Sequence, residues 1–479
     1  MLALWFMGAA LASSTADELL DPARFLIDRA ARSSGADVLY GARTSSAKSL
    51  VYRWAQVGGD GSEVDQVLAP ELGKQSMVFR PAGRLVAGTL TPGLQQGDRE
   101  DGILGLRAGL DARAYWKSVE LMAHPQFHLD ESQPSFALPL GWAGIHTEQW
   151  RVGFGLEERW FGPGRHGGLM LTDNARPAPL GSTAFEGRLG EHWGRVRAEV
   201  GAGWLDAPRV DVDRPGWLVM DFRWAPHPMV ELGLSRMSIF GGVDRPAPNI
   251  GQLILPTEPH VSDDPDQRLP DQDEIAAIDL RVTLPLGSWL SGSRAEPGHG
   301  LALDYLEVWM QYGGEDVIAR SIGPIPVPAL AGIANLWGGE LGLGDVTANL
   351  EWARVLDDQF RWYTGHRIYH EGFVQEGESM GHPSGGDSRT WNFSLRWMPG
   401  RWGAELVGED RLRVGGIDVS QGILRTLSND EHARSVGFRG WWLADGHAWW
   451  HAGFALEHTE NPGFQPVDIE RTWRIHIGR

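Results

Sequence analysis

The sequence contains no cysteine, which excludes a disulfide framework and thiolate chemistry in a chain of 479 residues. Lysine is scarce: it occurs at Lys48, Lys74 and Lys117, and arginine carries the remaining positive charge. The net charge of −19 argues against nucleic acid as a partner, because binding to phosphates requires clustered Lys and Arg. After the N-terminus no apolar run is long enough to cross a bilayer as a helix, so a helical membrane protein is excluded.

The N-terminus begins with a short apolar run that ends in small residues, Met1 to Ala12. This run resembles the apolar core and cleavage region of a secretory signal, although the basic leading segment is missing. We therefore predict a signal peptide, truncated at its start, over residues 1–16. Residues 17–75 place apolar side chains at helical spacing, and we predict short helices that must pack on a larger body to be stable.

From about residue 76 to the end, apolar and polar residues alternate with a period of two. In the run that ends at Leu156, Trp150, Val152 and Phe154 share one face and Arg151 lies on the other. The same alternation recurs over 196–204, 218–224, 278–284, 391–397 and 448–456. Strands of about ten residues, with tryptophan at their ends, are typical of a barrel in the outer membrane rather than a soluble sandwich.

The predicted connections between strands are of two kinds. Short turns containing Gly or Pro occur at 190–192, 225–228, 398–401 and 444–446. Long irregular stretches occur at 242–273, 314–333, 357–387 and 413–432. Tight turns on one rim and long loops on the other characterise bacterial outer-membrane barrels, with the tight turns on the periplasmic side. We therefore predict an all-β fold, with residues 76–479 forming a large antiparallel transmembrane β-barrel of roughly sixteen to eighteen strands.

Two segments resemble a known family. The first signature segment, Glu157 to Ser182, contains ERWFGPG and LMLTDNARP; the second signature segment, 363–387, contains YTGHRIYHEG followed by GHPSGGD. Both are similar to the Wzi-type capsule assembly family of outer-membrane proteins. The resemblance implies an eighteen-stranded barrel that is closed by the N-terminal helices on the periplasmic side and by folded loops outside. It also implies binding of exported capsular or exopolysaccharide at the cell surface, with no catalysis and no cofactor.

The first signature segment supplies candidate binding groups beside a glycine-rich turn. Sugar binding uses aromatic faces, and arginine suits the carboxylates of uronic acids. The candidates are Arg159, Trp160, Asn174 and Arg176. An alternative is favoured for the two arginines, namely that they stabilise the turn inside the lumen by donating hydrogen bonds to backbone carbonyls.

The second signature segment supplies the candidates Tyr363, Tyr369, His370 and Asp387. We interpret it as a solvated polar loop folded over the barrel mouth. His366 and His370 are four residues apart, which suits a metal only on a helix, and the glycines of this segment disfavour a helix. No metal site is therefore predicted.

Two other functions remain open from the sequence. Polar residues facing a lumen would suit a general diffusion porin, and an outer-membrane hydrolase is a further alternative. Catalysis is disfavoured because no spacing pairs two carboxylates, and neither a Gly-x-Ser-x-Gly nor a His-Glu-x-x-His motif occurs. The expected partners are a polysaccharide and outer-membrane lipid, without nucleic acid, for a monomeric protein.

Overall fold

The computed structural model describes a defined part of the chain. The described residues are 32, 42–44, 75–88, 104–129, 134–190, 192–254, 272–287, 303–315, 334–355, 362–366, 368–414, 417–418, 425–426, 429–444, 448–462 and 470–478. The predicted signal segment 1–16 and most of the predicted helical segment 17–75 lie outside these residues.

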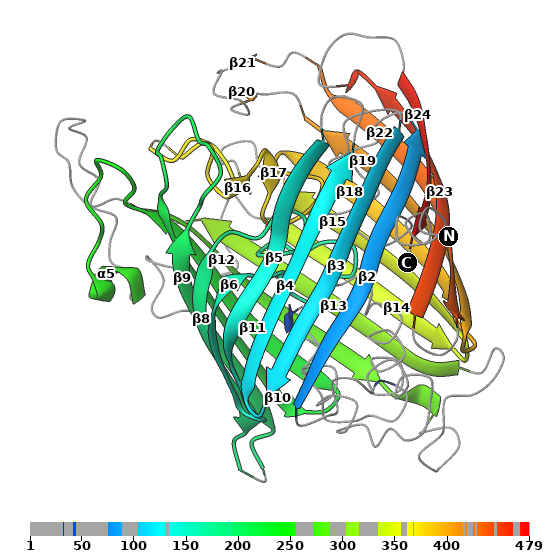
Figure 1. Ribbon diagram of the computed structural model, residues 1–479, viewed down its shortest axis with the longest axis horizontal. Helices are drawn as coiled ribbons and strands as arrows, with labels where there is room; N and C mark the ends of the chain where they lie inside the picture. The colour runs from blue at the N-terminus through cyan, green and yellow to red at the C-terminus, as the bar shows by residue number, and fades with distance from the viewer. Residues whose placement is uncertain are drawn as a thin grey trace.

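Eighteen strands of the described chain form one closed antiparallel barrel (Figure 1). Each strand pairs with the next strand of the ring, and β24 closes the ring against β2. The barrel strands are β2 (Gln75–Gly88), β3 (Leu104–Trp116), β4 (Val119–Leu129), β5 (Pro134–His146), β6 (Trp150–Leu156), β8 (Leu180–Arg188), β9 (Arg195–Trp204), β10 (Gly216–His227), β11 (Val230–Phe240), β12 (Gln272–Leu284), β13 (Leu303–Glu315), β14 (Ala334–Leu343), β15 (Val346–Val355), β18 (Ser388–Trp397), β19 (Trp402–Arg413), β22 (Glu431–Ala444), β23 (Ala448–Glu460) and β24 (Glu470–Gly478).

The remaining elements are not part of the ring of paired strands. They are β1 (Ala42–Thr44), β7 (Arg159–Phe161), β16 (Val374–Gln375), β17 (Glu378–Ser379), β20 (Ile417–Asp418), β21 (Arg425–Thr426) and α5 (Ile250–Ile254). Within the described residues, no helix combines the length and the apolar character needed to cross a membrane.

The alternation read from the sequence separates the two faces of the barrel wall. On β6, Trp150, Val152 and Phe154 are each about half exposed, whereas Arg151 is buried. On β12, Asp279 and Arg281 are buried in the same way. The polar side chains therefore face the lumen, and the apolar side chains face outward, as a strand between lipid and a polar interior requires.

The connections fall on two rims as predicted. One rim carries short turns, such as those between β8 and β9, β10 and β11, β18 and β19, and β22 and β23. The other rim carries the long loops between β11 and β12, β13 and β14, β15 and β18, and β19 and β22. Two connections depart from this rule: residues 285–302 join β12 to β13 on the short-turn rim, and only residues 130–133 join β4 to β5 on the long-loop rim. We assign the long-loop rim to the outer surface of the cell.

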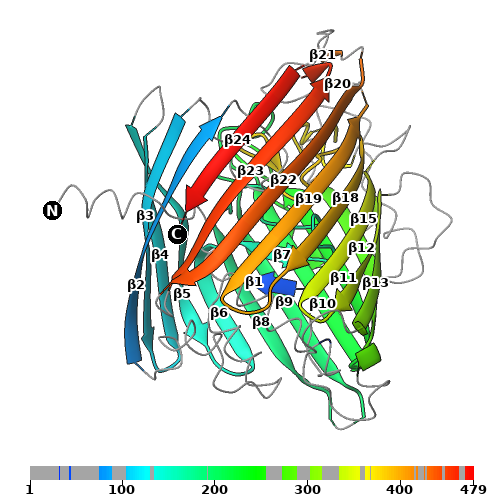
Figure 2. The ribbon, with the colours of Figure 1, turned by 90° about the vertical axis from the view of Figure 1, so that its right-hand side faces the viewer.

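The N-terminal part of the chain reaches the interior of the barrel. β1, which lies within the predicted helical segment 17–75, pairs antiparallel with β7, and Figure 2 shows both within the ring of strands. Arg32 has helical backbone geometry and is 2% exposed. Its guanidinium forms ion pairs with Glu307 on β13 at 3.1 Å and with Glu340 on β14 at 3.2 Å. This segment therefore contributes to the filling of the lumen.

Candidate functional site

The first signature segment leaves the barrel wall after β6 and enters the lumen. The carboxylate of Glu351 on β15 accepts the backbone N–H of Arg165 at 2.7 Å and that of His166 at 3.3 Å. The side-chain oxygen of Gln311 on β13 accepts the backbone N–H of Leu169 at 2.8 Å. Lumen-facing side chains of two strands thus satisfy the backbone of this tip, as buried N–H groups require.

Glycines allow the tip to pack this closely. A Cβ atom on Gly164 would lie 1.9 Å from the carbonyl oxygen of Gly167. A Cβ atom on Gly167 would lie 2.3 Å from the imidazole ring of His382, which belongs to the second signature segment. A larger residue at Gly164 would disrupt the turn itself, and one at Gly167 would force the two segments apart, so these glycines serve packing.

Tyr363 joins the two signature segments. Its hydroxyl donates to the carbonyl oxygen of Leu169 at 2.9 Å and accepts the backbone N–H of His382 at 2.8 Å. The indole N–H of Trp362 donates to the same Leu169 carbonyl at 3.2 Å. Tyr363 has a φ of 77°, a strained conformation for a bulky residue that the surrounding contacts must maintain.

Further hydrogen bonds extend this contact along both segments. The backbone N–H of Thr172 donates to the carbonyl of Met380 at 2.8 Å. The side-chain amide of Asn174 donates to the carbonyl of Ser379 at 2.7 Å. Segments that lie about two hundred residues apart in the sequence therefore form one unit inside the barrel.

An apolar core fixes this unit to the barrel wall. Tyr363 and Phe373 are buried beside side chains of the first signature segment and of lumen-facing strand positions. The wall and loop residues of this core include Phe161, Leu169, Met170, Leu205, Trp217, Met237, Ile239, Trp309, Leu336 and Val355. Because the core is made by side chains from loops and strands together, the loops behave as a packed plug.

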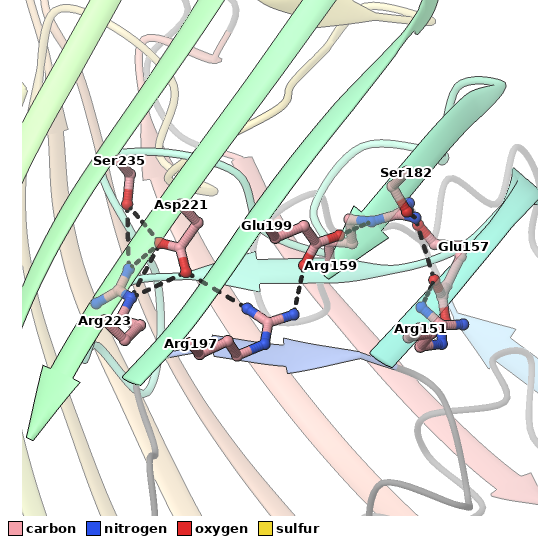
Figure 3. Close-up of polar contacts among 9 residues, drawn as sticks. All are labelled: Arg151, Glu157, Arg159, Ser182, Arg197, Glu199, Asp221, Arg223 and Ser235. Atoms are coloured by element: carbon pink, nitrogen blue, oxygen red, sulfur yellow. Dashed lines mark hydrogen bonds and ion pairs between the residues drawn. The ribbon is translucent and has the colours of Figure 1, made fainter. Parts of the chain in front are cut away.

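A row of alternating charges runs along the lumen wall from β6 to β12 (Figure 3). Arg159 contacts Glu157 at 3.2 Å and Glu199 at 2.9 Å. Its guanidinium also donates to the hydroxyl of Ser182 at 2.9 Å and to the backbone carbonyl of Glu157 at 3.3 Å. The full row is Arg151, Glu157, Arg159, Glu199, Arg197, Asp221, Arg223 and Asp279.

A second group of buried charges continues this pattern toward β14. Arg281 contacts Glu231 at 2.6 Å and Glu307 at 3.0 Å. The members of the group are Arg32, Arg165, Arg281, Glu231, Glu307 and Glu340. Both groups contain equal numbers of arginines and acids, so each guanidinium is neutralised by carboxylates, as buried charges require.

The plug presents a polar surface at the long-loop rim. We call residues 172–179, 205–214 and 364–377 the outer platform. Arg176 bridges Glu376 at 2.7 Å and Asp206 at 2.9 Å, and all three side chains reach solvent. The exposed fractions of the side chains are 25% for Arg176, 51% for Glu376 and 30% for Asp206.

A second ion pair anchors the platform. Arg209 contacts Asp211 at 2.9 Å. The carboxylate of Asp211 accepts the backbone N–H of Glu371 at 2.8 Å, and that of Glu371 accepts the backbone N–H of Val210 at 2.9 Å. Burial alone would raise the pKa of Asp211, but hydrogen bonds from Arg209 and its charge bring that pKa below its usual value. Burial raises the pKa of the Glu371 carboxyl.

The predicted site residues separate into two groups. Arg159, Trp160, Asn174, Tyr363 and Tyr369 are all less than 5% exposed and lie inside the plug. Arg176, His370 and Asp387 remain at least partly accessible. The favoured alternative for Arg159, a role in stabilising the turn, agrees with its contacts, although carboxylates supply most of its partners. A direct role in sugar binding stays a prediction for the accessible residues.

The interpretation of the second signature segment as a solvated loop is wrong for most of its aromatic side chains, although residues such as His370 and Glu376 are exposed. Tyr363, Tyr369, Phe373 and His382 are each at most 2% exposed, because their apolar surface packs against the first signature segment. Residues 168–171 form no strand, and the backbone of Leu169 bonds to the side chains of Gln311 and Tyr363.

Sequence reasoning missed Asp206, Arg209 and Asp211, which complete the outer platform. The alternation Arg209-Val210-Asp211 between two prolines was the available signal, but it lies outside both signature segments. Only the fold brings this loop against residues 371–376.

Two buried histidines lie where the signature segments meet. Burial lowers the pKa of His166 to about 4 and that of His382 to about 3. Nδ1 of His382 lies 2.7 Å from the hydroxyl of Ser384. Both imidazoles are therefore neutral at physiological pH. Among the described residues, no group of three or more His, Asp or Glu side chains is arranged to hold a metal ion.

Comparison with known proteins now decides the family. The family described as capsule assembly protein Wzi matches residues 79–462. The chain belongs to the Wzi capsule assembly family. This confirms the predicted family, the barrel fold and the outer-membrane location, and it favours capsule assembly over general diffusion.

Two solved structures illustrate what this Wzi family member is similar to. Wzi of Escherichia coli, an outer membrane protein involved in group 1 capsule assembly and a carbohydrate-binding β-barrel, has a TM-score of 0.67 and 16% identity. The alignment covers 98% of both chains. OprD of Pseudomonas aeruginosa has a TM-score of 0.47 and 9% identity, over 84% of this chain and 94% of the other. No curated protein matches this chain in sequence.

Proposed function

We propose that this Wzi family member binds capsular or exopolysaccharide at the outer platform and thereby holds it at the cell surface. The observation that carries the proposal is the union of two distant signature segments into one packed plug with a polar outer face. A rigid, preformed surface binds a flexible polymer with less loss of conformational entropy than mobile loops would. Carbohydrate binding by the related Escherichia coli protein supports the same function.

The contacts of the platform define which groups would meet the polymer. The Arg176 guanidinium is already engaged by Asp206 and Glu376, so it is not free to grip uronate carboxylates. The carboxylate of Glu376, which is held by Arg176 and is 51% exposed, and the exposed residue His370 face the solvent. Such groups form hydrogen bonds with sugar hydroxyls. We assign Arg176 the role of holding Glu376 and Asp206 in place.

The experiment is glycan binding by the purified protein in detergent. Capsular polysaccharide would be titrated against wild type, Glu376→Gln, His370→Ala and the control Arg401→Gln, in which an exposed arginine on the short-turn rim is replaced. We expect binding to weaken about fivefold for each platform variant, which corresponds to about 1 kcal/mol for one lost hydrogen bond, and to stay unchanged for the control. Unaltered binding by a Glu376→Gln/His370→Ala double variant would contradict the proposed site.

The same arrangement supports a role without catalysis. The buried pair of His382 and Ser384 is at most 3% exposed, so a polymer on the platform could not reach it. We propose that the protein has no hydrolase activity and needs no cofactor. Turnover of polysaccharide or lipid by the purified wild type would overturn this part of the proposal. The monomeric state and the absence of a nucleic-acid partner stay predictions from composition.

A further inference from the structure

The outward face of β19, β22, β23 and β24 is built from rows of residues that lie side by side (Figure 2). Paired residues of neighbouring strands project from the same face, so the register defines each row. One row consists of Leu406, Phe438, Phe454 and Ile475, which are all exposed and apolar. The next row toward the long-loop rim consists of Gly408, Val436, Leu456 and Trp473.

Tryptophans limit this apolar band at the short-turn rim. Trp402, Trp442 and Trp450 are register partners on three successive strands. Their ring centroids are 6.5 and 6.0 Å apart, with nearly parallel planes. Stacked indoles at the edge of an apolar band mark the boundary between lipid and water.

The opposite edge of the band is ionic. The row directly above Val436 and Leu456 consists of Asp410, Arg434, His458 and Arg471, one residue from each strand. Arg434 is 58% exposed and contacts Asp410 at 3.1 Å. This row lies at the long-loop rim, where the outer leaflet of the membrane presents its headgroups.

The ionic edge continues onto β15 and β18. Arg354 and Arg389 are register partners at the ends of these strands, and both face outward. One row below them, Trp352 and Trp391 form an aromatic pair with centroids 6.2 Å apart. Arginines therefore recur along the upper edge of the lipid-facing band, on four of its six strands.

These arginines differ from the others in the barrel. Among the described residues, Arg354, Arg389 and Arg471 form no ion pair. Among the described strand residues of this edge, four arginines accompany two carboxylates, Asp410, which contacts Arg434, and Glu460, which contacts His458, so arginines exceed carboxylates by two. This excess occurs on a protein with a net charge of −19.

Several other arginines of the barrel are paired with carboxylates. On β11, the guanidinium of Arg236 pairs with Glu274 and donates to the carbonyl of Leu253 in α5 at 2.6 Å. The lumen rows contain one carboxylate for each guanidinium, as described above. The edge formed by β15, β18, β19, β22, β23 and β24 differs from these paired arginines in that three of its four arginines form no ion pair with a described residue.

We propose that this basic edge, Arg354, Arg389, Arg434 and Arg471, binds the phosphorylated headgroup of a lipid in the outer leaflet. Guanidinium groups form charge-assisted, often bidentate hydrogen bonds with phosphate oxygens. The apolar rows below the edge provide the surface for the acyl chains of the same lipid. The inference does not depend on polysaccharide binding at the outer platform.

The test measures lipid retention by the full-length protein in detergent with native mass spectrometry. The probes are diphosphorylated lipid A, monophosphorylated lipid A and phosphatidylcholine. Wild type is expected to retain diphosphorylated lipid A most strongly, monophosphorylated lipid A less, and phosphatidylcholine least. The variant Arg389→Gln/Arg434→Gln/Arg471→Gln is expected to bind diphosphorylated lipid A at least about tenfold more weakly, since each basic residue at a membrane surface contributes several-fold.

Two further variants make the result decisive. Arg245→Gln removes an exposed arginine from the loop between β11 and β12, away from the basic edge, and should leave lipid retention unchanged. The single variant Arg471→Gln tests the edge if the triple variant fails to fold, with an expected loss of severalfold. Equal retention of the three lipids by wild type, or equal lipid A retention by Arg471→Gln and Arg245→Gln, would overturn the proposal.

Discussion

Tyr363 shows how much a single side chain contributes to the plug. Its hydroxyl connects the carbonyl of Leu169 to the backbone N–H of His382, while its own backbone is held at a φ of 77°. A buried backbone donor that loses its partner costs the full desolvation penalty of that group. Residues of this kind specify how the two signature segments meet.

The first prediction concerns this hydroxyl. Tyr363→Phe keeps the ring but leaves the N–H of His382 and the carbonyl of Leu169 without this partner, so we expect a loss of about 1–3 kcal/mol in plug stability. Limited proteolysis in detergent, followed by mass spectrometry, should show faster cleavage within 362–387. The control Tyr312→Phe removes a hydroxyl from the outward side of β13 and should cleave at the wild-type rate. Equal cleavage of the two variants would contradict the role given to Tyr363.

The second prediction concerns the pH dependence of the plug. The pKa values of His166 and His382 are lowered by burial to about 4 and about 3, below the ordinary value of 6.5. The unfolded loops therefore bind more protons than the folded loops between about pH 6.5 and 3, and stability must fall as the pH falls through this range. Protease protection of residues 362–387 should decrease from pH 7 to pH 4.5. His382→Gln should flatten this dependence, and an unchanged slope would contradict the assignment.

At the scale of elements, two loops from one rim form a folded body within the barrel. The tip of the first signature segment has a glycine, Gly167, where it touches the second segment. Side chains of the barrel strands accept hydrogen bonds from its backbone N–H groups. β1 adds a strand from the N-terminal segment to β7. The N-terminal segment and the outer loops are thereby joined through three residue pairs of one small sheet.

The third prediction tests this close contact. Gly167→Ala places a Cβ atom 2.3 Å from the ring of His382, and overpacking of this kind costs about 1–3 kcal/mol. We expect a lower unfolding temperature in detergent and weaker protection of both signature segments. Gly181→Ala on β8 is the matched control, because its Cβ would lie at ordinary contact distances of 3.6 Å or more. A wild-type unfolding temperature for Gly167→Ala would show that the segments are not tightly packed.

At the scale of the whole molecule, the lumen is occupied by a neutral, packed plug. The charge rows from β6 to β14 contain equal numbers of arginines and acids, and these side chains form ion pairs with one another. A diffusion porin instead keeps a polar, water-filled lumen. The wall and plug of this Wzi family member stabilise each other rather than line a wide channel.

The fourth prediction follows from this occupancy. In planar bilayers the purified wild type should show almost no steady conductance compared with an open barrel of similar strand number. The measurement is single-channel recording after insertion from detergent, with a known porin as the positive control. Large, stable conductance steps from the wild type would restore the diffusion porin as the better function.

Much of the fold was accessible from the sequence, because a barrel wall between lipid and a polar lumen imposes a period of two on every strand. That period predicted the strands around Trp150, Val200 and Phe393, and the lengths of the connections predicted the two rims. The two signature segments indicated the family without any coordinates. These properties depend on local pattern, so the chain order alone determined them.

The tertiary structure alone decided the environment of the candidate residues. Nothing in the sequence distinguishes Tyr363, which is buried in the plug, from His370, which is exposed on the outer platform. Arg159 contacts Glu199, and Arg176 contacts Glu376, which lies two hundred positions away in the sequence. Arg209 likewise contacts the distant residue Gly372. Burial and charge pairing are set by contacts between distant segments, and these contacts exist only once the loops have folded back into the barrel.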